Sequence, residues 1–143
     1  MNNTFFLNHQ LTANELFLIP EAFYQLVMAR IKVSVQKSQQ YLPKVKNEKA
    51  PAASIKNFEM LQTIATVING LSFRTPWPST CLVRVIAAHK MLCKREIPHV
   101  LHFGVQINSN KEIKAHAWLS AGSKILVGGE NAAGFKELSS IVI

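Results

Sequence analysis

Aspartate is absent from this chain of 143 residues, and all eight of its acidic residues are glutamate. A catalytic mechanism that requires an aspartate side chain is therefore excluded. Long apolar runs are also missing, since no stretch reaches the roughly 18 to 20 apolar residues that a membrane span needs. The apolar stretch 16–31 is interrupted by Pro20, Glu21 and Gln25, and it lacks the basic start and the cleavage site of a signal peptide. A cytoplasmic protein without a membrane span is expected.

Cysteine is scarce, because the chain has only Cys81 and Cys93. On one helix, a rise of 1.5 Å per residue separates these two positions by roughly 18 Å, whereas a disulfide needs Cα atoms within about 7 Å. The two thiols are therefore expected to stay unpaired, and they cannot share a metal ion. No C-x-x-C pair occurs, which argues against a zinc or dithiol centre. No metal and no cofactor are expected.

Acidic residues are also few, and the formal net charge is +8. Part of this excess is local, since the segment 30–56 contains Glu48 as its only acid. The segment is either a solvated helix face with a linker or a docking surface for an acidic peptide or partner. It has few aromatic residues and no recognisable motif, so nucleic acid is not an expected partner. Its basic residues are Arg30, Lys32, Lys37, Lys44, Lys46, Lys49 and Lys56.

The composition, 48% hydrophobic and 17% charged, is that of a globular protein, and the length fits one domain over residues 1–143. Within it we expect a helical part over 1–73 and a core over 74–143. Thr12 with Glu15 forms a capping box, and Pro20 either kinks the helix that starts there or opens a second one. Apolar periodicity predicts helices over 21–40, 54–69 and 80–95, a linker over 42–53, and strands over 99–107, 113–120 and 124–128.

These elements predict an α+β fold in which helices precede a small antiparallel sheet. Asn69-Gly70 is expected to end the second of the three predicted helices, and Ser79 or Thr80 to cap the third. The third helix then begins at Cys81. Its N–H groups and partial positive charge favour a thiolate, and they can stabilise an oxyanion.

His116 lies in the second predicted strand, which holds its ring more firmly than a loop would. A cysteine and histidine pair of this kind attacks amides or esters through an acyl-enzyme. Taken alone, however, a cysteine on an apolar helix face is more often a core residue. A zinc site of Cys81, His102 and His116 is a further, weaker alternative. Cys93 is expected in the core, His89 on the surface, and one of His99 and His102 in the core.

Several motifs at matched spacing then favour catalysis. A Cys-Leu-x-Arg sequence opens the helix, a basic helix end and Ile-Pro follow, a strand ends in Gly-Val, and the next strand contains His-Ala-Trp. With these motifs the chain resembles the transglutaminase-like maturation proteins of lasso-peptide biosynthesis, closely over about residues 74–138. The matching residues are Cys81, Leu82, Arg84, Lys94, Arg95, Ile97, Pro98, Gly104, Val105, His116, Ala117 and Trp118.

The resemblance implies a transglutaminase- or papain-like core, in which Cys81 at a helix N-terminus packs on the sheet that carries His116. It also implies a cysteine peptidase that removes the leader from a ribosomally made precursor. The partners implied are the precursor peptide, an ATP-dependent lasso cyclase and a separate leader-recognition protein. Trp118, Gly128 and Gly129 are candidates for substrate binding.

The third catalytic group stays open, because the family pattern places an aspartate on the strand after the histidine. A constant register from a turn at Gly122-Ser123 puts His116 opposite Gly129. Either Glu130 or Asn131 supplies the third group, or a backbone carbonyl or water does so, or the protein is a weakly active relative.

Two alternative functions remain beside leader removal. One is another thiol acyltransferase or amidase of transglutaminase-like fold. The other is a scaffold that binds the precursor or partner proteins.

Overall fold

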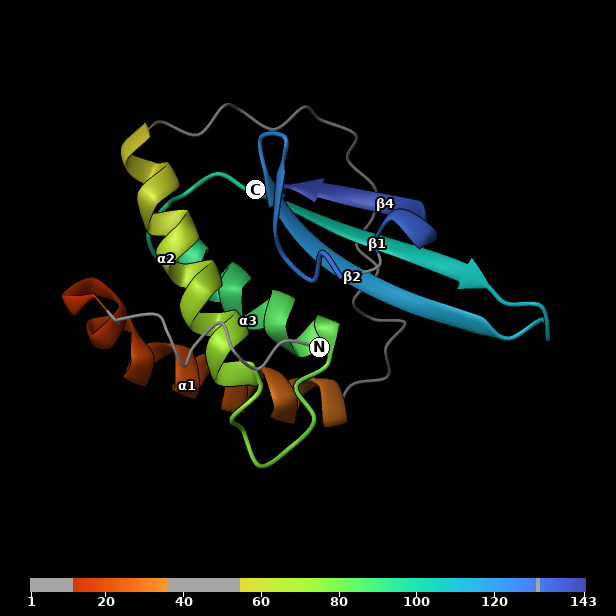
Figure 1. The fold of residues 1–143 in the computed structure, drawn as a ribbon, viewed down its shortest axis with the longest axis horizontal. Helices are drawn as coiled ribbons and strands as arrows, with labels where there is room; N and C mark the ends of the chain where they lie inside the picture. The colour runs from red at the N-terminus through yellow and green to blue at the C-terminus, as the bar shows by residue number, and fades with distance from the viewer. Residues whose placement is uncertain (1–11, 36–54, 131) are drawn as a thin grey trace.

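The computed structural model describes residues 12–35, 55–130 and 132–143, in which three helices precede a four-stranded antiparallel sheet (Figure 1). The predicted α+β class is confirmed. None of the described helices combines the length and the apolarity needed to cross a membrane. The elements are α1 (Ala13–Val35), α2 (Ile55–Ser72), α3 (Cys81–Cys93), β1 (Val100–Ile107), β2 (Ile113–Ala121), β3 (Lys124–Val127), the 3-10 turn η2 (Ala132–Gly134) and β4 (Lys136–Val142).

The start of α1 is fixed by the predicted capping box, which is confirmed. The backbone N–H of Thr12 donates to Glu15 Oε2 at 2.7 Å, and the N–H of Glu15 lies 3.3 Å from Thr12 Oγ1. Pro20 lies inside a single helix, so the alternative in which it opens a second helix is wrong. The predicted continuation over 36–40 and the linker over 42–53 lie outside the described residues.

The end of α2 differs from the prediction, because the helix runs past Asn69-Gly70 to Ser72. The hydroxyl of Ser72 donates to the carbonyl of Asn69 at 2.6 Å, which satisfies one of the acceptors that a helix end leaves free. Asn69 itself does not end the helix. Its side-chain amide instead donates to the carbonyl of Leu126 in β3 at 3.1 Å, so it joins α2 to the sheet.

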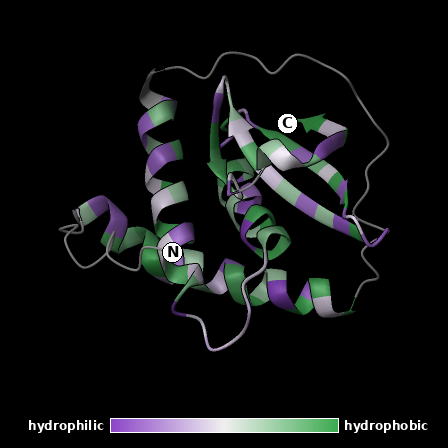
Figure 2. Ribbon diagram, turned by 45° about the vertical axis from the view of Figure 1, so that its right-hand side comes forward, coloured by the Kyte–Doolittle hydropathy of each residue, from purple (hydrophilic) through white to green (hydrophobic). Residues whose placement is uncertain are grey.

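The core gathers around α3, which packs against α1, α2 and β2 (Figure 1). On the face of α3 that begins at Cys81, the residues Val85, Ala88 and Leu92 are buried, whereas Cys81 is half-buried. Full burial of an aliphatic side chain such as Leu92 contributes about 1.5–3 kcal/mol. Figure 2 shows hydrophobic bands along the helices and an alternation of hydrophobic and hydrophilic residues along the strands.

The sheet has the strand order β3-β2-β1-β4, and its first three strands confirm the predicted meander. β2 and β3 pair as expected at Ala121↔Lys124 and Ser120↔Ile125, but the next pair is Leu119↔Val127. A β-bulge at Leu126 therefore shifts the register by one residue. The constant register that placed His116 opposite Gly129 is wrong for this reason. The sequence pattern predicts no strand over residues 136–142, yet they form β4 beside β1.

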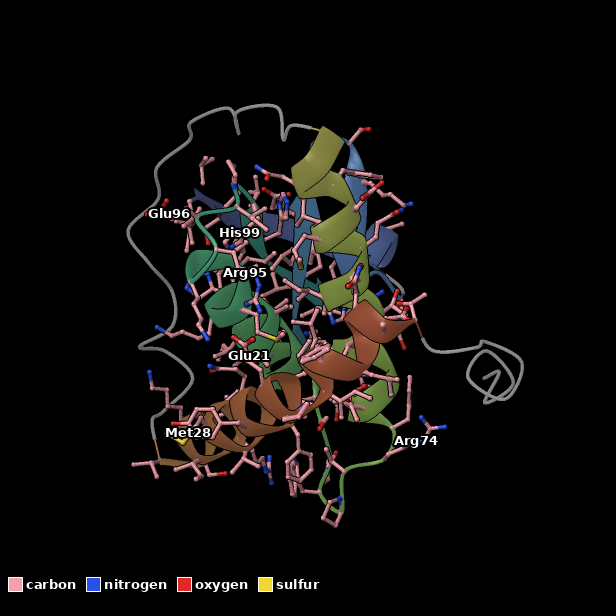
Figure 3. All side chains as sticks on the ribbon, turned by 90° about the vertical axis from the view of Figure 1, so that its left-hand side faces the viewer. Glu21, Met28, Arg74, Arg95, Glu96 and His99 are labelled. Carbon is pink, nitrogen blue, oxygen red and sulfur yellow. The ribbon has the colours of Figure 1, made fainter. Side chains whose placement is uncertain are left out.

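An ion pair joins the middle of α1 to the residues that follow α3. Arg95 Nη2 donates to Glu21 Oε2 at 2.6 Å and Arg95 Nη1 to Oε1 at 3.1 Å, while Lys94 lies 3.2 Å from the same carboxylate. Figure 3 shows Glu21 and Arg95 directed toward one another. The hydrogen bond from Arg95 is the main reason why the pKa of Glu21 is lowered from its usual value.

We expect this lowered pKa to make stability depend on pH. The charged form of Glu21 stabilises the fold above the pKa of the unfolded chain, and this contribution is lost as the pH falls through the folded pKa. Glu21→Gln should therefore reduce the free energy of unfolding by about 1 kcal/mol at pH 7, since the pair is partly solvated. Urea unfolding should show the difference in the free energy of unfolding between the two proteins shrinking as the pH falls below 4.5, the usual pKa of a glutamate. A gap that stays constant with pH would contradict an ionic origin.

Candidate active site

Cys81 is the first residue of α3, as the sequence predicts. The preceding Thr80 is the N-cap residue in extended conformation, but its side chain makes no capping hydrogen bond. The hydroxyl of Ser79 is also engaged elsewhere, 2.8 Å from Thr75 Oγ1, so the predicted side-chain cap is not formed. The N–H groups of the first helical turn therefore have no capping side chain. These N–H groups can therefore donate to an anion bound next to the Cys81 thiol.

His116 lies in β2 and is half-buried. Its Nε2 is 2.7 Å from the carbonyl oxygen of Gly128. Because a carbonyl can only accept, Nε2 carries the proton, and Nδ1 of the neutral ring keeps its lone pair. The ring also stacks on Phe135 with a centroid distance of 4.8 Å. Orientation and tautomer are both fixed, which is what a general base requires.

The Gly128 carbonyl reaches the imidazole because of the backbone around it. The bulge leaves Leu126 without a partner residue in β2, and the amide of Asn69 takes its carbonyl. Gly128 then adopts a positive φ of 73°. A Cβ atom on Gly128 would stand 2.4 Å from the backbone oxygen of Ala117, so only glycine fits.

Glu130, the sequence candidate for the third catalytic group, is bound to α3. Arg84 Nη1 donates to Glu130 Oε1 at 2.8 Å and Nη2 to Oε2 at 3.2 Å. This bidentate bond is the main reason why the pKa of Glu130 is lowered, and a weaker contribution comes from His116. Since Arg84 is one helical turn after Cys81, the ion pair joins the start of α3 to the segment that orients His116.

The other candidate residues are placed as follows. Cys81 and His116 both belong to the described part of the chain, and no hydrogen bond joins the Cys81 thiol to the His116 ring there. Trp118 and Gly128 are buried, and Gly129 is exposed. Asn131 lies outside the described residues.

A second group of polar residues lies on the same side of the sheet as His116. His102 stacks on Trp118 with an interplanar angle of 4°, and its Nε2 is 2.7 Å from Ser120 Oγ. Gly104 makes room for Trp118, because a Cβ there would lie 2.9 Å from its ring. Trp118 is thus held by its neighbours in β1 beside His116, at a ring distance of 6.0 Å.

Three side chains near the other end of α3 could hold a metal ion. The ligand atoms of His89, Cys93 and His99 all lie within 4.8 Å of one another, and they form the one such group found among residues 12–35, 55–130 and 132–143. The zinc site of Cys81, His102 and His116, the weaker alternative that the sequence leaves open, is therefore not formed. His99 is fully buried, which fits the expectation that one of His99 and His102 lies in the core. The sequence predicts His89 on the surface and Cys93 in the core, but both are half-buried.

A family model matches most of the chain. The model of the transglutaminase-like superfamily matches residues 24–140, which extend from α1 to β4. The chain belongs to the transglutaminase-like superfamily. The match indicates a cysteine-based catalytic domain, with Cys81 at the helix start and His116 on the sheet as compatible positions. No curated protein and no solved structure gives a significant match.

We predict that Gly128→Ala is far more damaging than Gly122→Ala. Both glycines have a positive φ, but a Cβ on Gly122 meets nothing within 4 Å. Gly122→Ala should cost about 1 kcal/mol of backbone strain. Gly128→Ala adds a clash with Ala117, so its total should reach about 3 kcal/mol or more. Denaturant unfolding of both variants checks this, and equal losses would show that the close approach at Gly128 is unimportant.

Proposed function

We propose that this protein is a cysteine peptidase that removes the leader from a ribosomally made lasso-peptide precursor. The observation that supports it most is the state of His116. Its Nε2–H is held by the Gly128 carbonyl, so Nδ1 is the nitrogen left for proton transfer. Superfamily membership and the uncapped helix start at Cys81 support the same chemistry.

In the proposed reaction, His116 Nδ1 accepts the proton of the Cys81 thiol, and the thiolate attacks the carbonyl carbon at the end of the leader. The tetrahedral intermediate collapses when the C–N bond breaks, and the imidazolium protonates the amine of the released core. Water then attacks the thioester, with His116 as base, and frees the leader carboxylate. This transfer requires the Cys81 thiol and His116 Nδ1 to come within hydrogen-bond reach when the peptide binds, as catalytic groups commonly do only in the substrate complex.

The start of α3 would stabilise the charge that develops during this reaction. The negative oxygen of the tetrahedral intermediate forms next to the thiol, where the N–H groups of the first turn have no capping side chain. Such donors need no reorganisation when the charge appears, and the loss of one typically costs a factor of about 10²–10³ in kcat.

Other proteins would complete the pathway in the cytoplasm, where ribosomal precursors are made. A separate leader-recognition protein would present the precursor, and an ATP-dependent lasso cyclase would close the released core. No nucleic acid and no cofactor take part in this proposal.

The test is cleavage of a precursor peptide encoded beside this gene, followed by mass spectrometry with and without the neighbouring leader-binding protein. We expect a single cut between leader and core. Cys81→Ser keeps the size of the side chain but should abolish cleavage, and His116→Gln should reduce it by about 10³-fold or more. Ser123→Ala, in the exposed turn before β3, serves as the control and should cleave normally.

The alternatives make different predictions in the same assay. An amidase or acyltransferase would turn over small acyl donors in a Cys81-dependent manner and leave the precursor intact. A scaffold would bind the precursor equally well as the parent chain and as Cys81→Ser, and would cut nothing. Either result would replace the peptidase proposal.

We further propose that the Gly128 carbonyl is the third group of the site and that Glu130 only positions its segment through Arg84. If so, Glu130→Ala should lower kcat by about tenfold and leave the acidic limb of the pH–rate profile in place. Arg84→Ala should have an effect of similar size, and the double variant should be little worse than either, since one contact is removed in all three.

A different outcome would identify Glu130 as the group that orients His116. Removal of the carboxylate that orients a catalytic histidine lowers kcat by about 10⁴-fold. A loss of that size in Glu130→Ala, with a displaced acidic limb and a nearly normal Arg84→Ala, would exclude the Gly128 carbonyl as the sole orienting group.

A further inference from the structure

We propose that His89, Cys93 and His99 form a zinc-binding site at the opposite end of α3 from Cys81. His89 Nδ1 lies 2.9 Å from His99 Nε2, and Cys93 Sγ lies 3.4 Å from His89 Nδ1. These contacts bring two imidazole nitrogens and one sulfur together, the donor set that zinc and copper prefer. The site lies outside the machinery of the proposed peptidase.

The backbone brings the three ligands together. His89 and Cys93 are four residues apart on α3, so they lie on the same side of the helix. The chain then turns at Glu96, which has a positive φ of 53°, and the N–H of Ile97 returns to the carbonyl of Leu92. This turn places His99 beside the last turn of the helix, where its ring is fully buried.

His99 makes the hydrogen bond that metal-binding histidines usually make with the ring nitrogen that does not bind the metal. Its Nδ1 donates to the carbonyl of Ile97 at 2.7 Å, which leaves Nε2 as the nitrogen facing His89 and Cys93. A backbone acceptor of this kind fixes the tautomer and raises the basicity of the ligating nitrogen. Half-buried His89 and Cys93 provide the side from which an ion can enter.

The spacing is close to what zinc requires. With Zn–N of about 2.0–2.1 Å and Zn–S of about 2.3 Å, tetrahedral ligands stand roughly 3.3 Å apart for two nitrogens and 3.5 Å for nitrogen and sulfur. The 3.4 Å between Cys93 and His89 already fits. The two imidazole nitrogens must separate by a few tenths of an ångström from 2.9 Å, and His89 must move its proton from Nδ1 to Nε2. The third pair, Cys93 Sγ and His99 Nε2, lies within 4.8 Å and must close to about 3.5 Å when the ion binds.

Three protein ligands leave a fourth position for water. The negative end of the α3 dipole lies beside the site and favours a cation, and the Cys93 thiolate offsets one of its charges. Positive charge from Lys90 and Lys32 acts on His89 and opposes a dication. These two lysines make copper(I), with its single charge, the competing ion.

The site would support structure rather than the chemistry at Cys81. His89 is eight residues from Cys81, which is roughly 12 Å along the helix, so a metal there does not touch a substrate at the thiol. It would join the last turn of α3 to the start of β1. Zinc should therefore raise the melting temperature in a concentration-dependent manner, because it binds the folded chain.

The test uses the full chain, stripped of metal with a chelator and titrated with Co²⁺ as a spectroscopic substitute. We expect one equivalent of Co²⁺ to give the intense visible bands of a tetrahedral ion and a thiolate-to-cobalt charge-transfer band, and Zn²⁺ to displace it. Cys93→Ser should remove the charge-transfer band, and His89→Gln, which removes a direct ligand, should weaken Zn²⁺ binding by more than the factor of about 10–100 that loss of an outer hydrogen-bond partner costs. Both replace half-buried rather than buried residues, so the variants should fold, which circular dichroism checks.

Cys81→Ser is the matched control, since it removes the other thiol on the same helix. It should bind Co²⁺ and Zn²⁺ like the parent chain, although it cannot cleave peptide. Loss of the charge-transfer band in Cys81→Ser but not in Cys93→Ser would assign the metal to the candidate active site and overturn the proposal. The proposal is equally overturned if no thiolate band appears for Co²⁺, or if Cu⁺ but not Zn²⁺ binds and raises the melting temperature.

Discussion

The hydrogen bond between His116 Nε2 and the Gly128 carbonyl is the contact on which the candidate site depends. A histidine in β2 has many rotamers and two tautomers, and this bond selects one of each. In the absence of any aspartate, a backbone carbonyl is a sufficient partner for that purpose. It cannot offer the full charge with which a carboxylate stabilises the imidazolium, so orientation is its main contribution.

That carbonyl is in place because three separate contacts hold the backbone around it. Asn69 of α2 takes the carbonyl that the bulge at Leu126 leaves free, and Gly128 passes so close to the Ala117 backbone that a side chain would not fit. Two residues later, Glu130 is bound to Arg84 of α3. The imidazole is thereby positioned relative to both helices, although it belongs to neither. A small sheet needs such ties, since its edge strand β3 is only four residues long.

The sequence predicts the elements whose signal is local and misses those that depend on tertiary contacts. The capping box at Thr12, the helix start at Cys81 and the alternation along β1 and β2 are all evident from neighbouring residues. The bulge in β3 is not, because the carbonyl that it leaves free is satisfied by Asn69, 57 positions away in the sequence. The sequence predicts a helix end at Asn69 because asparagine tolerates the left-handed conformation in which helices often end. The segment 136–142 lacks strict alternation, and its bulge at Leu138 explains why the sequence pattern does not predict β4.

The two ends of α3 show how one helix can serve two opposite kinds of chemistry. At its start, uncapped N–H groups and the positive end of the dipole favour an anion, such as the oxyanion of the proposed reaction. At its end, the negative dipole end faces His89, Cys93 and His99, whose donor atoms suit a cation. Two cysteines on one helix would thus differ in role because of where they stand along it. Their separation along the axis would let a metal ion bind at Cys93 without occupying the thiol of Cys81.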